Sequence, residues 1–170
     1  MTLPPDRPGA TAPSSEIRPA RPDDRGAVLA LMPRLEAFGL PANIAAGTLA
    51  AGETRALAGA FDRMPDGHAL YVAVDPSGTI IGALYLETRE DYFTSVRHGH
   101  VGVLAVAEAA EGRGVGRALL ATADAWARAA GFDRLTLSVF DSNVRARALY
   151  ERAGYAVDLV RYRKDVGTGS

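Results

Sequence analysis

The chain has 170 residues, a length that allows one domain with a substantial hydrophobic core. Its formal net charge is -1, which excludes the strongly basic surface of a protein that binds nucleic acid or an anionic membrane. It has no cysteine, which excludes disulfides, thiolate nucleophiles and cysteine zinc sites, and its three histidines do not form a metal cluster on their own.

The two ends of the chain differ in composition from the rest. Residues 1–15 contain four prolines and no apolar segment of a secretory signal, so we expect a disordered lead-in there. Residues 166–170 are expected to be a loose tail, which leaves residues 16–165 as one domain. No apolar run reaches the roughly 18 residues that a membrane-spanning helix needs. These features predict a cytoplasmic protein.

The first elements predicted along the chain are a strand and two helices. Residues 17–20 form a short strand, and apolar residues at helical spacing follow it. Pro33 lies inside that helical pattern and predicts a break near Met32, because proline removes a backbone donor. A second helix is expected at about 44–63. Its apolar side is formed by Leu49, Leu57, Phe61 and Met64.

The middle of the chain predicts three strands. Residues 69–74 and 79–87 form a hairpin around residues 75–78, a turn in which proline fixes φ and glycine accepts a positive φ. A polar loop is expected over 89–97, and a further strand over 99–106.

The last part of the chain alternates helices and strands. We expect a helix at about 115–130, a strand at 135–139, a short helix at 143–153 and one or two closing strands within 155–164. No internal repeat and no domain boundary interrupts this order. The pattern predicts a single α/β domain with a mixed sheet.

A glycine-rich turn joins the strand over 99–106 to the helix that follows, with the sequence E-G-R-G-V-G-R over residues 111–117. The first turn of a helix has unpaired N–H groups and carries the positive end of the helix dipole. Glycine lets the backbone approach a phosphate closely, and Arg113 and Arg117 add positive charge. The turn therefore predicts a pyrophosphate site.

Three phosphate-binding motifs compete for this turn. A P-loop requires Lys-Ser/Thr after its last glycine, whereas Arg117-Ala118 follows Gly116. The dinucleotide motif G-x-G-x-x-G, started at Gly114, would end on Leu119. The G-x-G-x-G turn of acyl-CoA-binding proteins fits, and a turn that needs glycine for its geometry alone is the remaining alternative.

Two further segments accompany the turn. Leu104-Ala105-Val106 precedes it, and residues 143–155 read N-x-x-A-x-x-L-Y-x-x-x-G-Y. In this order and spacing, the three segments resemble the GNAT superfamily of N-acetyltransferases over roughly residues 16–165. The resemblance implies an α/β (α+β) fold with a mixed, mostly antiparallel sheet flanked by helices on both faces. It also implies an enzyme that transfers an acetyl group from acetyl-CoA, its co-substrate, to a primary amine.

The resemblance assigns cofactor contacts residue by residue. Backbone groups of Leu104 and Val106 would pair with the pantetheine arm like an added strand, and backbone N–H groups of 112–117 would hold the pyrophosphate. Glu111 departs from the family, which usually has Arg or Gln there, and a carboxylate cannot donate to phosphate. The cofactor-binding residues expected are Leu104, Ala105, Val106, Gly112, Arg113, Gly114, Val115, Gly116, Arg117 and Asn143.

Two of the matched residues have a second interpretation. Tyr150 would give a proton to the departing thiolate, or it is an aromatic residue of the core. Asn143 would contact the cofactor arm, cap the last helix, or do both.

The proton acceptor has two candidates. His100 lies upstream of Leu104, and strand alternation places His98, His100 and Gly102 on the same face as Leu104 and Val106. A histidine of pKa near 6.5 takes a proton at neutral pH, which predicts an acidic limb below about pH 6.5. Glu87 on the neighbouring strand is the second candidate, and a chain of waters without either residue is the third possibility.

The reaction expected is direct attack of the amine in a ternary complex, because no cysteine is available for an acyl-enzyme. The acceptor stays open between a small-molecule and a peptide amine, and Tyr92 and Phe93 are candidates for lining its pocket. A non-catalytic acyl-CoA sensor and a nucleotide-binding module are the rival functions. The resemblance also allows a homodimer, and we expect neither nucleic acid nor membrane as a partner and no metal cofactor.

Overall fold

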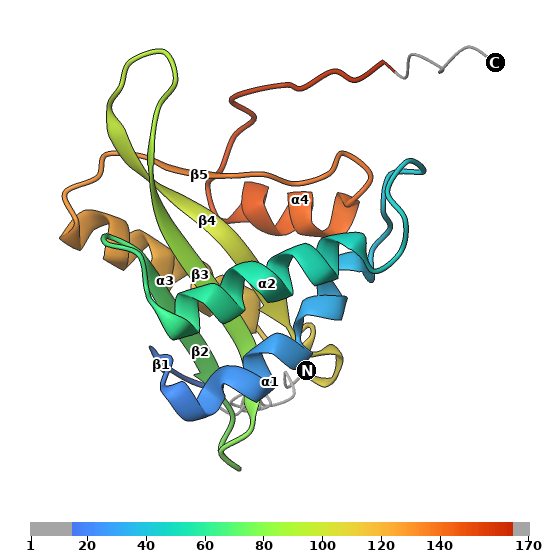
Figure 1. Cartoon of the computed structure of the whole chain (residues 1–170), viewed down its shortest axis with the longest axis vertical. Coiled ribbons are helices and arrows are strands. Elements are labelled where there is room, and N and C mark those ends of the chain that lie inside the picture. The colour runs from blue at the N-terminus through green and yellow to red at the C-terminus, as the bar shows by residue number, and fades with distance from the viewer. Residues whose placement is uncertain (1–14, 165–170) are drawn as a thin grey trace, which may run out of the picture.

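The computed structural model describes residues 15–164 and arranges them around a five-stranded sheet (Figure 1). All but the last residue of the expected lead-in, and the expected tail, lie outside the described residues. The strands are β1 (Glu16–Pro19), β2 (Ala69–Val74), β3 (Ile80–Glu90), β4 (Arg97–Val106) and β5 (Leu135–Leu137). The helices are α1 (Arg25–Ala30), α2 (Thr48–Asp62), α3 (Val115–Ala129) and α4 (Val144–Arg152), with short 3₁₀ helices η1 (Pro22–Asp24), η2 (Met32–Glu36) and η3 (Glu108–Ala110).

The sheet has the order β1-β2-β3-β4-β5. The first four strands pair antiparallel, and β5 pairs parallel to β4. Helices cover both faces, and Figure 1 shows α2 crossing in front of the sheet. The expected mixed, mostly antiparallel sheet with helices on both faces is confirmed.

Two buried clusters hold the helices on the sheet. On one face, α1, η2 and α2 pack on β2, β3 and β4; the buried members include Val28, Met32, Leu57, Val72 and Tyr85. On the other face, α3 packs on β3 and β4; its buried contacts include Leu84, Leu86, Val101, Leu119 and Ala123. Burial of these side chains at about 25 cal/mol per Å² is the main force that fixes the layers.

The end of α1 and the start of α2 both have local causes. The predicted break at Pro33 is confirmed, since α1 ends at Ala30 and a 3₁₀ turn with proline in its first positions replaces the helix. The second helix begins at Thr48, four residues later than about Ile44. Glu36 explains that start, because its carboxylate accepts the N–H groups of Gly47 at 2.7 Å and of Ala50 at 2.9 Å.

Strand β4 contains one extra residue relative to β3. Tyr85 lies opposite Val103, whereas Leu86 lies opposite Val101, so Gly102 has no partner of its own. Such a β-bulge disturbs the ladder locally and inverts the alternation of side chains beyond it.

The bulge overturns one expectation from the sequence. His100 pairs with Glu87 and lies on the face of the sheet that α2 covers, whereas Leu104 and Val106 pack on the α3 face. The placement of His98, His100 and Gly102 on one face with Leu104 and Val106 is therefore wrong, because simple alternation ends at Gly102.

The closing strands expected within 155–164 are also wrong. No strand is formed by the described residues after α4, and β5 ends at Leu137 instead of Val139. Figure 1 shows the segment after α4 running away from the body of the molecule. A three-residue β5 offers few hydrogen bonds to a neighbouring strand, which explains why β-prone residues alone do not extend the sheet.

Candidate active site

The glycine turn lies between β4 and α3 and leaves the start of the helix open. Gly112 and Gly114 have φ values of +71° and +81°, a left-handed conformation that strains other residues. Gly114 is the N-cap of α3, and no side chain caps this helix. A Cβ added at Gly112 or Gly114 would meet no atom within 4 Å. The start of α3 thus has no side-chain cap and the space beside both glycines is open, as a phosphate site would require; the phosphate contact itself stays a prediction.

Gly116 serves a different purpose from the other two glycines. Its backbone is helical, and a Cβ there would lie 3.1 Å from Cδ2 of Leu149 on α4 and 3.9 Å from Cγ2 of Val106. Gly116 is therefore needed for the close approach of α4 to the start of α3. Helix packing is thus a second reason for glycine at this position, and the contact of Gly116 with phosphate stays a prediction.

The second half of β4 has an unpaired edge in the described part of the chain. β5 pairs only with residues 99–101 of β4, so the edge of Val103–Val106 that faces away from β3 has no neighbouring strand. An extended chain with alternating donors and acceptors can add to such an edge. Leu104, Ala105 and Val106, the residues expected to pair with a pantetheine arm, lie on this edge and lead into the glycine turn.

Helix α4 lies next to the glycine turn, where Leu149 faces Gly116 and Arg145 pairs with Glu111. Asn143 is its N-cap, and the Oδ1 atom accepts the Ala146 N–H at 3.0 Å. The capping interpretation of Asn143 is confirmed, and the contact with a cofactor stays a prediction. None of the side chains of α4 is buried, so the helix rests on the rest of the molecule mainly through half-buried residues such as Leu149 and Tyr150.

Tyr150 is half-buried at the end of α4, and its ring meets that of Tyr155 edge-on at 6.0 Å between centroids. Burial raises the pKa of the Tyr150 hydroxyl above its ordinary value. Burial also raises the pKa of Tyr155 to about 12, and its buried hydroxyl has no hydrogen-bond partner within residues 15–164. Both phenols hold their proton at neutral pH, the state that a proton donor requires.

The two candidate proton acceptors are register partners on β3 and β4, on the face covered by α2. His100 is buried, and its Nδ1 lies 2.8 Å from Oγ1 of Thr136. Burial, reinforced by the charge of Arg89, lowers the pKa of His100 to about 4. An acidic limb near pH 6.5 therefore does not follow from His100, contrary to the expectation from its ordinary pKa.

Glu87 lies closer to the bulge. Its Oε1 atom is 3.0 Å from where a Cβ of Gly102 would stand, so the absence of a side chain at Gly102 leaves room for this carboxylate. Its Oε2 atom accepts from Nε of Arg89 at 2.7 Å. The side chain of Glu87 is 20% exposed, which leaves it accessible to a water or a substrate. Within residues 15–164, no hydrogen bond or ion pair joins Glu87 or His100 to Tyr150 of α4.

The sequence interpretation missed Glu53. This residue of α2 is half-buried, and burial raises its pKa, with the negative charge of Glu87 as a further cause. The signal was present in the sequence, because Glu53 stands four residues from both Leu49 and Leu57 on the predicted apolar side of the helix. A carboxyl group on such a stripe faces the sheet, and here it lies near Glu87.

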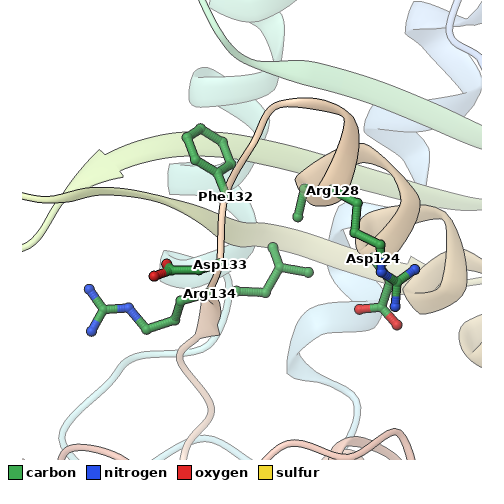
Figure 2. Close-up of a pocket in the computed structure, with 7 residues that line it drawn as sticks. Asp124, Arg128, Phe132, Asp133 and Arg134 are labelled. Carbon is green, nitrogen blue, oxygen red and sulfur yellow. The ribbon is translucent and has the colours of Figure 1, made fainter.

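Other features of the molecule lie away from this region. A surface pocket between the C-terminal half of α3 and β5 is lined by oppositely charged side chains, among them Asp124, Arg128, Asp133 and Arg134 (Figure 2). Tyr92 and Phe93 are exposed in the loop between β3 and β4, as predicted. The helices described here are too short or too polar to cross a membrane. Within residues 15–164, no group of three histidine, aspartate or glutamate residues could hold a metal ion.

Comparisons with known proteins identify a matching family and several relatives. The model of the acetyltransferase (GNAT) family matches residues 42–155. Mycothiol acetyltransferase of Salinispora tropica is 42% identical over 92 residues, which are 54% of this chain and 30% of that protein. Aminoglycoside N(6′)-acetyltransferase type 1 of Stenotrophomonas maltophilia is 33% identical over 90 residues, which are 51% of this chain and 59% of that protein. The matched segment thus spans less than a third of the length of the mycothiol enzyme.

Solved structures show the same fold at low identity. An aminoglycoside 6′-N-acetyltransferase from Acinetobacter baumannii superposes with a TM-score of 0.66 at 14% identity, over 91% of this chain and 100% of that chain. Glucosamine-6-phosphate N-acetyltransferase from Arabidopsis thaliana gives 0.63 at 14% identity, over 91% and 99%. Identities this low are informative about the fold alone.

Proposed function

Because the chain belongs to the acetyltransferase (GNAT) family, we propose that it transfers an acetyl group from acetyl-CoA to a primary amine by direct attack in a ternary complex. The observation that carries this proposal is the uncapped start of α3 at Gly114, directly beside the unpaired edge of β4. The start of α3 suits the phosphates of CoA, and the adjoining edge of β4 suits its amide-containing pantetheine arm. We also propose that the protein acts in the cytoplasm and binds acetyl-CoA there.

The chemistry requires two proton transfers. The neutral amine nitrogen bonds to the thioester carbonyl carbon, and a backbone N–H of Val103–Val106 stabilises the negative charge that develops on the carbonyl oxygen. The C–S bond then breaks, the sulfur takes the electron pair, and Tyr150 gives it a proton. The proton lost by the amine goes to Glu87 or, through water, to solvent. Holding both substrates together supplies most of the acceleration.

The acceptor that we propose is a small-molecule amine. Relatives named for mycothiol and for aminoglycosides support this class, as do two carboxyl groups, Glu53 and Glu87, on the face opposite α3. The exposed pair Tyr92 and Phe93 stands in the loop that continues from β3, where it could contact a bound acceptor. A peptide amine is the alternative acceptor.

A screen of amine acceptors that follows release of free CoA tests the proposed function. We expect turnover with at least one small amine and micromolar-range affinity for acetyl-CoA. Binding of acetyl-CoA without turnover across a broad panel would favour the non-catalytic sensor. Tighter binding of ATP or NAD than of CoA would favour the nucleotide-binding module.

For the proton acceptor, the structure supports Glu87 over His100. Glu87→Gln should lower kcat/KM at pH 7.5 by about tenfold, because a neutral amide cannot take the proton. The matched variant His100→Gln keeps a polar partner for Thr136 and should stay within about threefold of wild type. The check is kcat/KM between pH 5 and 9. A wild-type rate in Glu87→Gln together with a large loss in His100→Gln would return the role to the histidine.

We also propose that a second copy of the chain covers the exposed segment after α4. Val157, Leu159, Val160 and Tyr162 are each at least 61% exposed, and the outer edge of β5 has no neighbour among the described residues. Pairing between two copies would cover both. Sedimentation equilibrium should give the mass of a dimer, and Leu159→Asp should shift it to the monomer. A wild-type monomer at 100 μM would contradict this proposal.

A further inference from the structure

Glu111 joins three parts of the molecule at the first position of the glycine turn. Its Oε2 atom lies 2.7 Å from Nη1 of Arg145 on α4. Its Oε1 atom accepts from Nη2 of Arg34 on η2, and Arg34 also reaches Glu108 at 3.5 Å. The carboxylate is 20% exposed and the Arg34 side chain 22%, so this is a partly desolvated network and not a surface ion pair.

The ring of Phe38 contacts the guanidinium groups of the same two arginines. The guanidinium of Arg145 lies 4.8 Å from the centre of the Phe38 ring, and that of Arg34 lies 5.6 Å from it. Both distances are within the range of a cation–π contact. Glu111 and Phe38 together hold two guanidinium groups next to each other, an arrangement that their like charges would otherwise oppose.

The network offers more N–H donors than its two carboxylates, Glu111 and Glu108, use. Two guanidinium groups present ten N–H donors, and the side chain of Arg145 is 54% exposed. Arg34 and Arg145 with Glu111 and Glu108 carry no net charge, and Arg113 and Arg117 of the turn add two positive charges. A guanidinium held at this place has free donors for an oxyanion.

We propose that Glu111 is a positioning residue that holds Arg145, with Arg34 behind it, at the glycine turn so that Arg145 binds a phosphate group of the acyl-CoA co-substrate. The inference rests on the proposed function. It explains how the chain tolerates an acidic residue where its family usually has Arg or Gln. The positive side chain is supplied from α4 and is held in place by the carboxylate.

Calorimetric titration of CoA, dephospho-CoA and pantetheine tests this inference. Arg145→Gln should weaken CoA binding about tenfold, and Glu111→Gln about fivefold, since the released arginine is less often in place. The double variant should bind CoA no more weakly than Arg145→Gln, because both changes remove one contact. Pantetheine, which has no phosphate, should bind all variants within about twofold of wild type, which also shows that the site remains folded.

The matched control is Arg147→Gln. Arg147 stands two residues further on α4 and forms its own ion pair with Asp141 at 2.5 Å, so this variant removes a charge and an ion pair without touching Glu111. It should bind CoA as the wild type does. A loss with CoA alone would place the contact on the 3′-phosphate, and an equal loss with dephospho-CoA would place it on the diphosphate; both results support the inference.

Two results would overturn it. Tighter CoA binding by Glu111→Gln would mean that the carboxylate competes with phosphate for the arginines. If Arg145→Gln and Glu111→Gln bind CoA as the wild type does but have a lower melting temperature, the network only stabilises the fold. In both cases the proposed function would stand, whereas failure of the wild type to bind CoA would overturn the function and the inference together.

Discussion

Gly114→Val should weaken CoA binding by roughly 10–100-fold, the largest loss that we expect from one substitution. Gly114 has a φ of +81°, a conformation that costs a β-branched residue about 1–3 kcal/mol. Valine would therefore move the backbone that starts α3, and its side chain would enter the space next to the uncapped N–H groups. Calorimetric titration with CoA measures the effect.

Gly131→Val is the matched control for backbone strain. Gly131 follows the other end of α3 with a φ of +74°, and a Cβ there also meets no atom within 4 Å. The control should lower the melting temperature without changing the affinity for CoA. If Gly114→Val binds CoA as well as the control does, the glycine turn does not hold the phosphates.

Gly116→Val should also weaken CoA binding, for a different reason. The added side chain would push Leu149 and the rest of α4 away from the start of α3. Leu149→Ala in the same chain should recover part of the affinity, whereas it should not rescue Gly114→Val.

The second large effect that we expect is on the chemical step. Tyr150→Phe should lower kcat by about 10–100-fold and leave CoA affinity nearly unchanged, because the hydroxyl is used only when the C–S bond breaks. A thiol with a pKa of about 8.5 is already a fair leaving group, which limits the loss. Burial raises the pKa of Tyr150 above the ordinary tyrosine value of about 10. Tyr150 should therefore stay protonated up to about pH 10, and its ionisation should not lower kcat in that range.

Tyr155→Phe is the control for the phenol. The Tyr155 ring contacts that of Tyr150, and its buried hydroxyl has no partner in the described part of the chain, so removing it should leave the stability unchanged or higher. Its kcat should match that of the wild type. A kcat for Tyr150→Phe within about twofold of the wild type would make Tyr150 an aromatic packing residue.

The helices and the glycine turn were predictable because their signals are local. Val115, Leu119 and Ala123 recur at helical spacing, and α3 begins at the predicted residue and ends one residue early. The bulge at Gly102 was not predictable, because a glycine inside an alternating strand is compatible with regular and with bulged pairing. The face of His100 and the role of Gly102 beside Glu87 depended on that one residue.

Interactions between distant segments were also beyond the sequence. Val157 and Leu159 have the β-propensity of a strand, but propensity does not say whether a partner edge is long enough to pair with. Glu111 was recognised as a departure from its family, yet its partners Arg34 and Arg145 lie 77 and 34 positions away. Only the fold brings these charges together.

The shallow attachment of α4 has a consequence for motion. A helix of nine residues with no buried side chain has little to hold it when the rest of the domain is intact, so its local unfolding should require far less free energy than global unfolding. Both Arg145 and Tyr150 belong to this helix. A ligand that binds at the glycine turn and contacts Arg145 would add contacts to α4 and restrict the conformational freedom of the helix. Part of the binding free energy is then consumed in ordering α4, and amide hydrogen exchange in residues 144–152 should be the most sensitive reporter of cofactor occupancy in the chain.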